Sequence, residues 1–242
     1  MTGSAETPLA ATYLRLADDA LVHGHRLSEW IGHAPTPEEE LALGNIALDL
    51  IGQARALYQA AERLVGRTED ELAYLRDQGQ FRNALISELP RGDFAFSILR
   101  LLLTAAAWDG VWRVAARSDD VALAAIGARA AKENAYHLRH AAEWTARLGD
   151  GTAESHRRAQ RALDTLWPYS AEMLDPFPAA IEAPSRAEWA AIVDPVLARA
   201  ALARPADGWS HSGGRAGRHT EHLGRLLAEM QTLPRSFPGA AW

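Results

Sequence analysis

The sequence predicts an all-α protein, an antiparallel four-helix bundle with additional C-terminal helices. Apolar residues recur with helical spacing over four long segments, and capping residues stand just before several of them. No run alternates β-branched and polar residues as a half-buried strand does. The 242 residues suit one large domain. We therefore expect residues 1–242 to form a single domain, with its core bundle at about 8–149 and peripheral helices at about 152–233.

Two long helices are predicted in the N-terminal part of the chain. The first covers residues 8–31, because its apolar residues keep helical spacing until Gly32 closes the segment. The second starts at Thr36-Pro37-Glu38-Glu39, which supplies an N-cap threonine, a proline at the first helical position and a capping-box glutamate. It runs to about Gly66.

A short helix and two further long helices follow. Thr68 to Glu71 reads as a capping box that opens a short connecting helix. Asp93 can cap a third long helix over residues 94–117. Ser118, followed by two aspartates, starts a fourth that ends near Gly149. These four long helices are the expected bundle.

The C-terminal third predicts helices packed outside the bundle. One covers residues 152–174 with a kink at Trp167-Pro168, since proline removes a helical hydrogen bond. A second is capped at Ser185 and interrupted near Asp194-Pro195, and a last helix covers residues 219–233.

Composition excludes several classes of function. Without cysteine, the chain has no disulfide, thiolate metal site or cysteine nucleophile. A net charge of −6 with scattered arginines argues against nucleic-acid binding. MTGSAETPLA lacks the basic start and apolar run of a signal peptide, and we find no stretch as apolar as a membrane span. We expect a cytoplasmic protein whose partners are neither nucleic acid nor membrane.

Acids and histidines share the helix faces that we expect to point into the bundle. These ligand-face candidates are Asp18, Asp49, Asp109, Glu133 and His137. Burying carboxylates costs several kcal/mol each unless metal, cations or hydrogen bonds compensate. Ferritin-like diiron enzymes use such acids as ligands, and the four-helix pattern is therefore predicted to be ferritin-like.

The ligand pattern of a diiron site is incomplete in this chain. Such sites take Glu-x-x-His from two helices, but Asp49 is followed by Gly52 at that spacing and Glu133 by Tyr136. His137 lies at i+4, which can still reach a metal. We therefore expect no metal, cofactor or catalytic residue in this chain. Arg113, Arg129, Lys132 and His137 would instead pair with the acids. The alternative is an active metal-dependent oxygenase with a degenerate site at Asp18, Asp49, Glu133 and His137.

Several segments, in order along the chain, resemble one protein family. The segments are Arg26–Pro35, Asn45–Arg55, Lys132–Arg139, Gly217–Gly224 and Leu227–Gln231. They resemble the C subunits of the bacterial phenylacetyl-CoA ring epoxidase. The resemblance implies a structural, metal-free ferritin-like subunit of the oxygenase complex in aerobic phenylacetate catabolism. It also implies a partner, the catalytic subunit that holds the diiron centre and binds the CoA thioester, within a homodimer or hetero-oligomer.

Two motifs near the C-terminus have both a functional and a structural interpretation. The loop Gly213–Arg218 could hold a phosphate, as a CoA nucleotide requires, but no strand precedes it, and an ordered connection is the default. His219 and His222 are three residues apart, whereas helical zinc ligands prefer four. We expect structural roles for both motifs.

Overall fold

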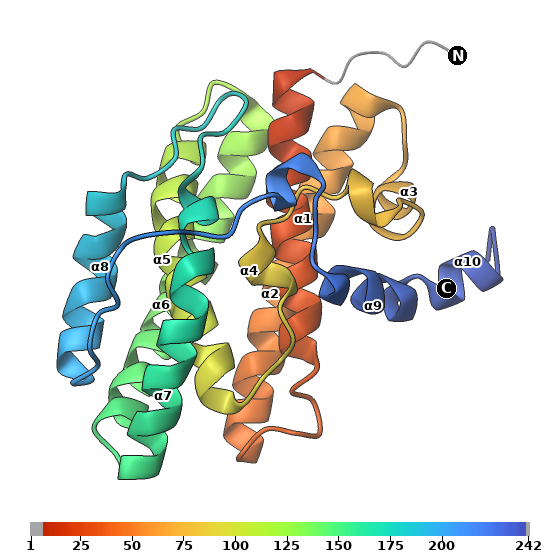
Figure 1. The fold of residues 1–242 in the computed structure, drawn as a ribbon. Helices are drawn as coiled ribbons and strands as arrows, with labels where there is room; N and C mark the ends of the chain where they lie inside the picture. Colours follow the sequence, from red (N-terminus) through yellow and green to blue (C-terminus); the bar gives the residue numbers. More distant parts are fainter. Residues whose placement is uncertain (1–6, 241–242) are drawn as a thin grey trace.

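Four long helices form the centre of the protein. The computed structural model describes residues 7–240, and the regular structure in that range is helical, without a strand. The long helices are α1 (Pro8–Ser28), α2 (Pro37–Val65), α5 (Phe94–Ala115) and α6 (Val121–Gly149). α1 packs along α2, α5 packs along α6, and α2 packs against α6, so two helical hairpins lie side by side (Figure 1). The all-α prediction is confirmed.

Side-chain caps fix where the long helices begin. Each cap oxygen accepts a first-turn N–H that has no partner inside its helix. The caps are Thr7 for α1, Thr36 for α2, Asp93 for α5 and Asp120 for α6. α2 ends at Gly66, whose φ of +67° lies in the left-handed region that glycine tolerates. The predicted starts hold, although α6 begins after Asp120 rather than directly after Ser118.

The connection between the hairpins contains α3 (Glu69–Tyr74), a 3₁₀ turn (Gln78–Gln80) and α4 (Leu85–Glu88). The predicted capping box of α3 is confirmed. The Glu71 N–H donates to the Thr68 hydroxyl at 3.2 Å, and the Thr68 N–H donates to the Glu71 carboxylate at 2.8 Å. No local signal predicts α4, because this buried single turn has no side-chain cap and depends on its tertiary contacts.

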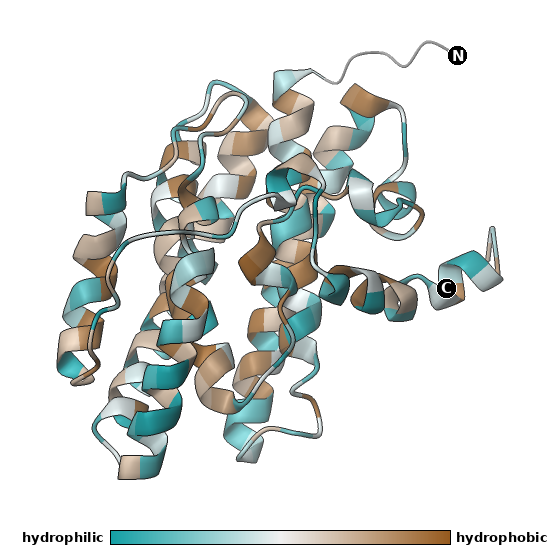
Figure 2. Ribbon diagram, in the orientation of Figure 1, coloured by the Kyte–Doolittle hydropathy of each residue, from teal (hydrophilic) through white to brown (hydrophobic). Residues whose placement is uncertain are grey.

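The C-terminal third covers the α5–α6 hairpin and then crosses to α1. α7 (Ala153–Leu166) and α8 (Arg186–Arg199) pack on α5 and α6, with hydrophilic residues on the outward side of α7 (Figure 2). The predicted helix over 152–174 is broken, because Trp167-Pro168 ends α7 and starts two 3₁₀ turns, Trp167–Tyr169 and Ala171–Leu174.

α8 and the last helices correct two predicted boundaries. α8 continues through Pro195, so the predicted interruption is wrong. Trp189, Val193 and Leu197 are all buried at i, i+4 and i+8, and this packing requires an unbroken helix across the proline. The predicted final helix over 219–233 is two helices, α9 (Glu221–Met230) and α10 (Thr232–Ser236), which follow a 3₁₀ turn at Gly214–Ala216.

α5 is the core helix of the protein. It is long and apolar enough to cross a membrane by composition alone, which corrects the expectation that no stretch is. However, 83% of its most apolar window is buried inside the protein, as in the core helix of a globular bundle. Residues 1–6, on which the signal-peptide prediction partly rests, lie outside the described range.

Candidate functional site

The four predicted acids do not converge on one point. Asp18 faces the connection after α3, and Asp109 lies on the outer side of α5 beside Arg113. Asp49 and Glu133 lie where α2 meets α6. We call this contact the α2–α6 seam and define it by Asp49, Gln53, Arg129, Glu133 and His137. The ligand-face candidates therefore occupy three separate environments.

Asp18 is fully buried and is neutralised by an arginine. Its carboxylate accepts a hydrogen bond from the Tyr58 hydroxyl at 2.6 Å and from the Arg82 N–H at 2.7 Å. The Arg76 guanidinium binds both carboxylate oxygens, one of them at 3.1 Å. Burial and the Asp18 charge raise the pKa of Tyr58 well above its usual value, so the phenol keeps its proton. Arg76, which lies between α3 and the 3₁₀ turn, was not predicted as the partner of Asp18.

Two reciprocal hydrogen bonds join α2 and α6 in the seam. His137 Nε2 lies 2.9 Å from the Asp49 carboxylate, and the Gln53 amide donates to the Glu133 carboxylate at 2.8 Å. In each bond an acid of one helix binds a residue of the other helix that lies four positions after that helix's own acid. His137 follows Glu133 at this spacing, and Gln53 follows Asp49. Two equivalent hydrogen bonds, each between a residue of α2 and a residue of α6, therefore join the two helices at the seam.

Charge in the seam is balanced by Arg129 and not by His137. The Arg129 guanidinium donates to Glu133 at 2.7 Å. Burial lowers the pKa of His137, although the neighbouring Asp49 carboxylate opposes this shift. The His137 ring is therefore neutral at pH 7, and its Nε2–H donates to Asp49.

Three of the four expected partners face an acid in the structure. Arg113 pairs with Asp109 at 3.0 Å, Arg129 with Glu133 and His137 with Asp49. The Arg113–Asp109 pair is partly exposed and contributes little stability. Lys132 is exposed and makes no ion pair with another residue in the described part of the chain.

Comparison with known proteins places this helical chain in a family. The model of the phenylacetic acid catabolic protein family matches residues 1–242. The chain belongs to the phenylacetic acid catabolic protein family. It is also 43% identical to the C subunit of the 1,2-phenylacetyl-CoA epoxidase of Escherichia coli (strain K12), over 97% of this chain and 99% of that protein. The resemblance noted in the sequence is confirmed.

The residues of this family member do not fit a diiron centre. Among residues 7–240, no group of three or more histidines and acids is arranged to hold a metal ion. The two positions that would carry the histidines of Glu-x-x-His lie on the outer side of the seam: Tyr136 is 41% exposed, and a Cβ at Gly52 would meet only the Arg129 guanidinium, at 3.9 Å. The inward positions belong to Gln53 and His137, which already bind the acids.

The glycine-rich loop does not hold an external phosphate in this family member, because a buried carboxylate occupies its donors. The N–H groups of Gly213 and Arg215 donate to Glu172 at 2.8 and 3.2 Å. The Arg215 side chain pairs with buried Asp19 at 2.7 Å. The phosphate interpretation is therefore wrong, and the loop ties the C-terminal segment to α1.

His219 also has a structural position. One ring nitrogen lies 2.7 Å from the buried Glu88 carboxylate, and the other lies 3.0 Å from the Phe81 carbonyl oxygen. The Thr220 N–H donates to the same carboxylate at 2.6 Å. Glu88 thereby anchors the start of α9, and no second histidine joins this cluster.

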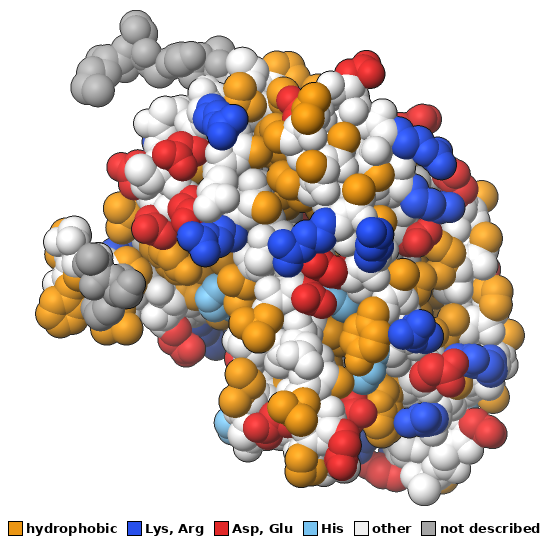
Figure 3. Space-filling model, turned by 180° about the vertical axis from the view of Figure 1, so that it is seen from behind, with side chains coloured by type: hydrophobic (Ala, Val, Ile, Leu, Met, Phe, Trp, Pro, Cys, Tyr) orange, Lys and Arg blue, Asp and Glu red, His pale blue; other side chains and the backbone are white. Residues whose placement is uncertain are grey.

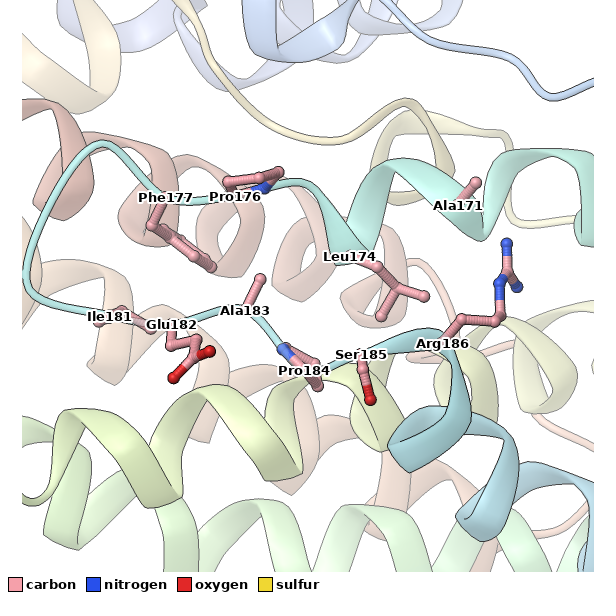
Figure 4. A pocket seen from close by; sticks show the side chains of 10 residues that line it. All are labelled: Ala171, Leu174, Pro176, Phe177, Ile181, Glu182, Ala183, Pro184, Ser185 and Arg186. Carbon is pink, nitrogen blue, oxygen red and sulfur yellow. The ribbon is translucent and has the colours of Figure 1, made fainter.

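A surface pocket of about 610 Å³ lies between the 3₁₀ turn at Ala171–Leu174 and the start of α8 (Figure 4). Leu174 and Phe177 are among its apolar lining residues (Figure 4). Glu182 and Arg186 are its charged residues. The Ser185 hydroxyl in its lining donates to the Glu188 carboxylate at 2.8 Å, but this pair forms the capping box of α8, so the lining does not suggest a reaction.

Proposed function

We propose that this chain is a structural, non-catalytic subunit of a phenylacetyl-CoA epoxidase complex in the cytoplasm. The related protein of Escherichia coli is named as the C subunit of that enzyme. One observation supports the non-catalytic role most directly: donors from this chain bind Asp18, Asp49 and Glu133. The iron chemistry would then belong to a partner catalytic subunit that holds the diiron centre and binds the CoA thioester.

The ferritin-like four-helix bundle forms part of this proposal. Two antiparallel helical hairpins that meet along α2 and α6 have the arrangement from which such bundles are built. The core bundle would cover about residues 8–149 of a single domain, with α7 to α10 packed around it. A partner of the same bundle type would then associate with it through exposed helix surfaces.

Co-expression with the catalytic diiron subunit tests the proposal. We expect the two chains to co-elute in size-exclusion chromatography at micromolar concentration. We also expect the isolated chain, after anaerobic loading with Fe(II) and desalting, to retain much less than one iron per chain and to consume no oxygen. Two chains that never co-elute would contradict the subunit role. Stoichiometric iron with oxygen consumption by the isolated chain would favour the degenerate oxygenase instead.

A further inference from the structure

The segment that leads into α8 crosses the protein surface without a backbone hydrogen bond. It comprises residues 176–184 and reverses direction between Phe177 and Ile181 (Figure 4). Within the described residues, no N–H or carbonyl group of this segment bonds to another backbone group. Two side chains of α1, Thr12 and Arg15, bind its backbone instead. The segment is therefore held to the bundle by a few side-chain contacts.

Both ends of this segment are fixed. At its start, the Arg15 guanidinium donates to two successive carbonyl oxygens, each at 2.6 Å, and lies over the Phe177 ring at 4.1 Å. At its other end, Pro184 packs on Gly110 of α5, where a Cβ would lie 2.8 Å from the proline side chain. We call residues 178–183, between these two anchors, the flap.

The flap itself has two attachments to the bundle. The Thr12 hydroxyl accepts a hydrogen bond from the Ala179 N–H at 3.1 Å and can donate to the Ala179 carbonyl oxygen at 2.9 Å. Ile181 is the one buried residue of the flap, with 7% of its surface exposed. Between them, Ala180 has a φ of +63°, in the left-handed region that is unfavourable for a residue with a Cβ. The closed flap is weakly attached and carries backbone strain.

Thr12 has a hydrogen-bond acceptor even when the flap is displaced. Its hydroxyl oxygen also lies 3.0 Å from the Pro8 carbonyl oxygen, one turn earlier in α1. The single hydroxyl hydrogen can therefore move from Ala179 to Pro8, so opening leaves no buried donor without a partner. The main cost of opening is then the exposure of Ile181 to water.

Three surface cavities have the flap as a wall. The pocket of about 610 Å³ and a smaller cavity of about 270 Å³ are both lined by Glu182 and Ala183. A third cavity, of about 540 Å³, is lined by Ala179 and Ala180. Behind the flap, the second and third cavities share Val114 of α5. Residues of the flap therefore separate the cavities from one another.

We propose that the flap opens between its fixed ends and joins the three cavities into one cleft between α1, α5 and α8. Thr12 controls the closed position, because it makes the only hydrogen bonds to the flap among residues 7–240. Opening is a property of this chain alone, so it does not depend on the proposed function. By contrast, the molecule seen from behind shows hydrophobic, basic and acidic side chains interspersed (Figure 3), a mixed surface that indicates no single class of partner.

Cysteine labelling tests the opening, because the chain has no native cysteine. Ile181→Cys puts a thiol on the buried side of the flap, and Val111→Cys, at a position 1% exposed in α5, is the matched control. In the folded chain, an aromatic disulfide reagent should react at least about tenfold faster with Ile181→Cys than with Val111→Cys. A smaller ratio would overturn the flap.

Thr12→Val distinguishes opening of the flap from direct access of the reagent. It removes the hydroxyl, so labelling of Ile181→Cys should become at least about fivefold faster, while labelling of Val111→Cys should not change. Thr104→Val is the matched control, because Thr104 is also fully buried and its hydroxyl contacts no residue of the flap. Equal acceleration of both thiols by Thr12→Val would show an effect on the whole fold and would overturn the proposal.

Hydrogen exchange of the unsubstituted chain gives a readout without an introduced thiol. The Ala179 N–H, which donates to Thr12, should exchange at least about tenfold faster in NMR than the amides at the centre of α5, after correction for intrinsic rates. Protection of Ala179 equal to that of the α5 amides would overturn the flap, even if Ile181→Cys reacts quickly. Neither measurement uses a partner chain, so both results are independent of the subunit role.

Discussion

Asn in place of Asp18 tests whether arginine, and not a metal, neutralises the acids of this protein. The Asp18 and Arg76 side chains are 0% and 3% exposed, so neither charge is solvated by water. Arg76 is also held by the Leu72 and Gln80 carbonyl oxygens and lies over the Phe81 ring at 4.1 Å, so it stays in place when the carboxylate is removed. Asp18→Asn therefore leaves a buried cation without its anion, which costs about 3–5 kcal/mol.

Urea unfolding followed by circular dichroism measures this cost. With an m-value of about 3 kcal/mol per M, the midpoint should fall by about 1 M or more. Asp109→Asn is the matched control, because Asp109 is in a partly exposed pair and its loss should cost less than about 1 kcal/mol. Adding Arg76→Met to Asp18→Asn should cost much less than the sum of the single variants, since no charge then remains buried alone.

Two outcomes would refute this reasoning. If Asp18→Asn destabilises no more than Asp109→Asn, the buried pair does not contribute as its geometry indicates. If the double variant is additive within about 0.5 kcal/mol, Asp18 and Arg76 are not coupled. In either case the hydrogen bonds from Tyr58 and Arg82, and not the ion pair, would determine the stability of this cluster.

Three further predictions concern Gly214, His137 and the outer side of the seam. Gly214→Ala should destabilise by about 1–3 kcal/mol in urea unfolding, because its Cβ would lie 2.2 Å from the Asn83 carbonyl oxygen; Gly208→Ala, with nothing nearby, should change little. Burial lowers the pKa of His137, so as the pH falls the unfolded chain is protonated at this residue before the folded chain is. The free energy of unfolding should therefore fall as the pH drops below about 6.5, by up to about 1.4 kcal/mol per pH unit. The free energy of unfolding of His137→Gln should depend less steeply on pH. Gly52→His combined with Tyr136→His should not raise the iron content measured after anaerobic loading, because both side chains lie on the outer side of the seam.

Local signals in the sequence suffice for most of the helices. The Thr36-Pro37 start of α2 and the Asp93 cap of α5 depend only on neighbouring residues, and both hold in the structure. α4 and the continuous helix through Pro195 depend on burial against distant segments, which no local rule contains. Helix starts are thus predicted better than short turns and proline positions.

The site was harder to predict because its contacts join distant residues. Arg76 is 58 positions from Asp18 in the sequence and lies outside any long helix, so a helical face cannot reveal the pair. Asp109 shares a helix with buried residues, but the adjacent Gly110 packs against Pro184, so this side of α5 faces the C-terminal segment and not the centre of the bundle. Gln53 does share a helix face with Asp49, and this was the available signal for the seam.

Gly52 and Arg129 together explain how the seam accommodates its acids although no histidine lies three residues after either acid. The Arg129 guanidinium donates to Glu133 one turn along α6, at 2.7 Å, and faces Gly52 of α2. A histidine at position 52 would extend well beyond the Cβ, which alone already lies 3.9 Å from that guanidinium. A histidine at position 52 would therefore begin in van der Waals contact with the guanidinium that binds Glu133. In this chain the cation that neutralises Glu133 is Arg129.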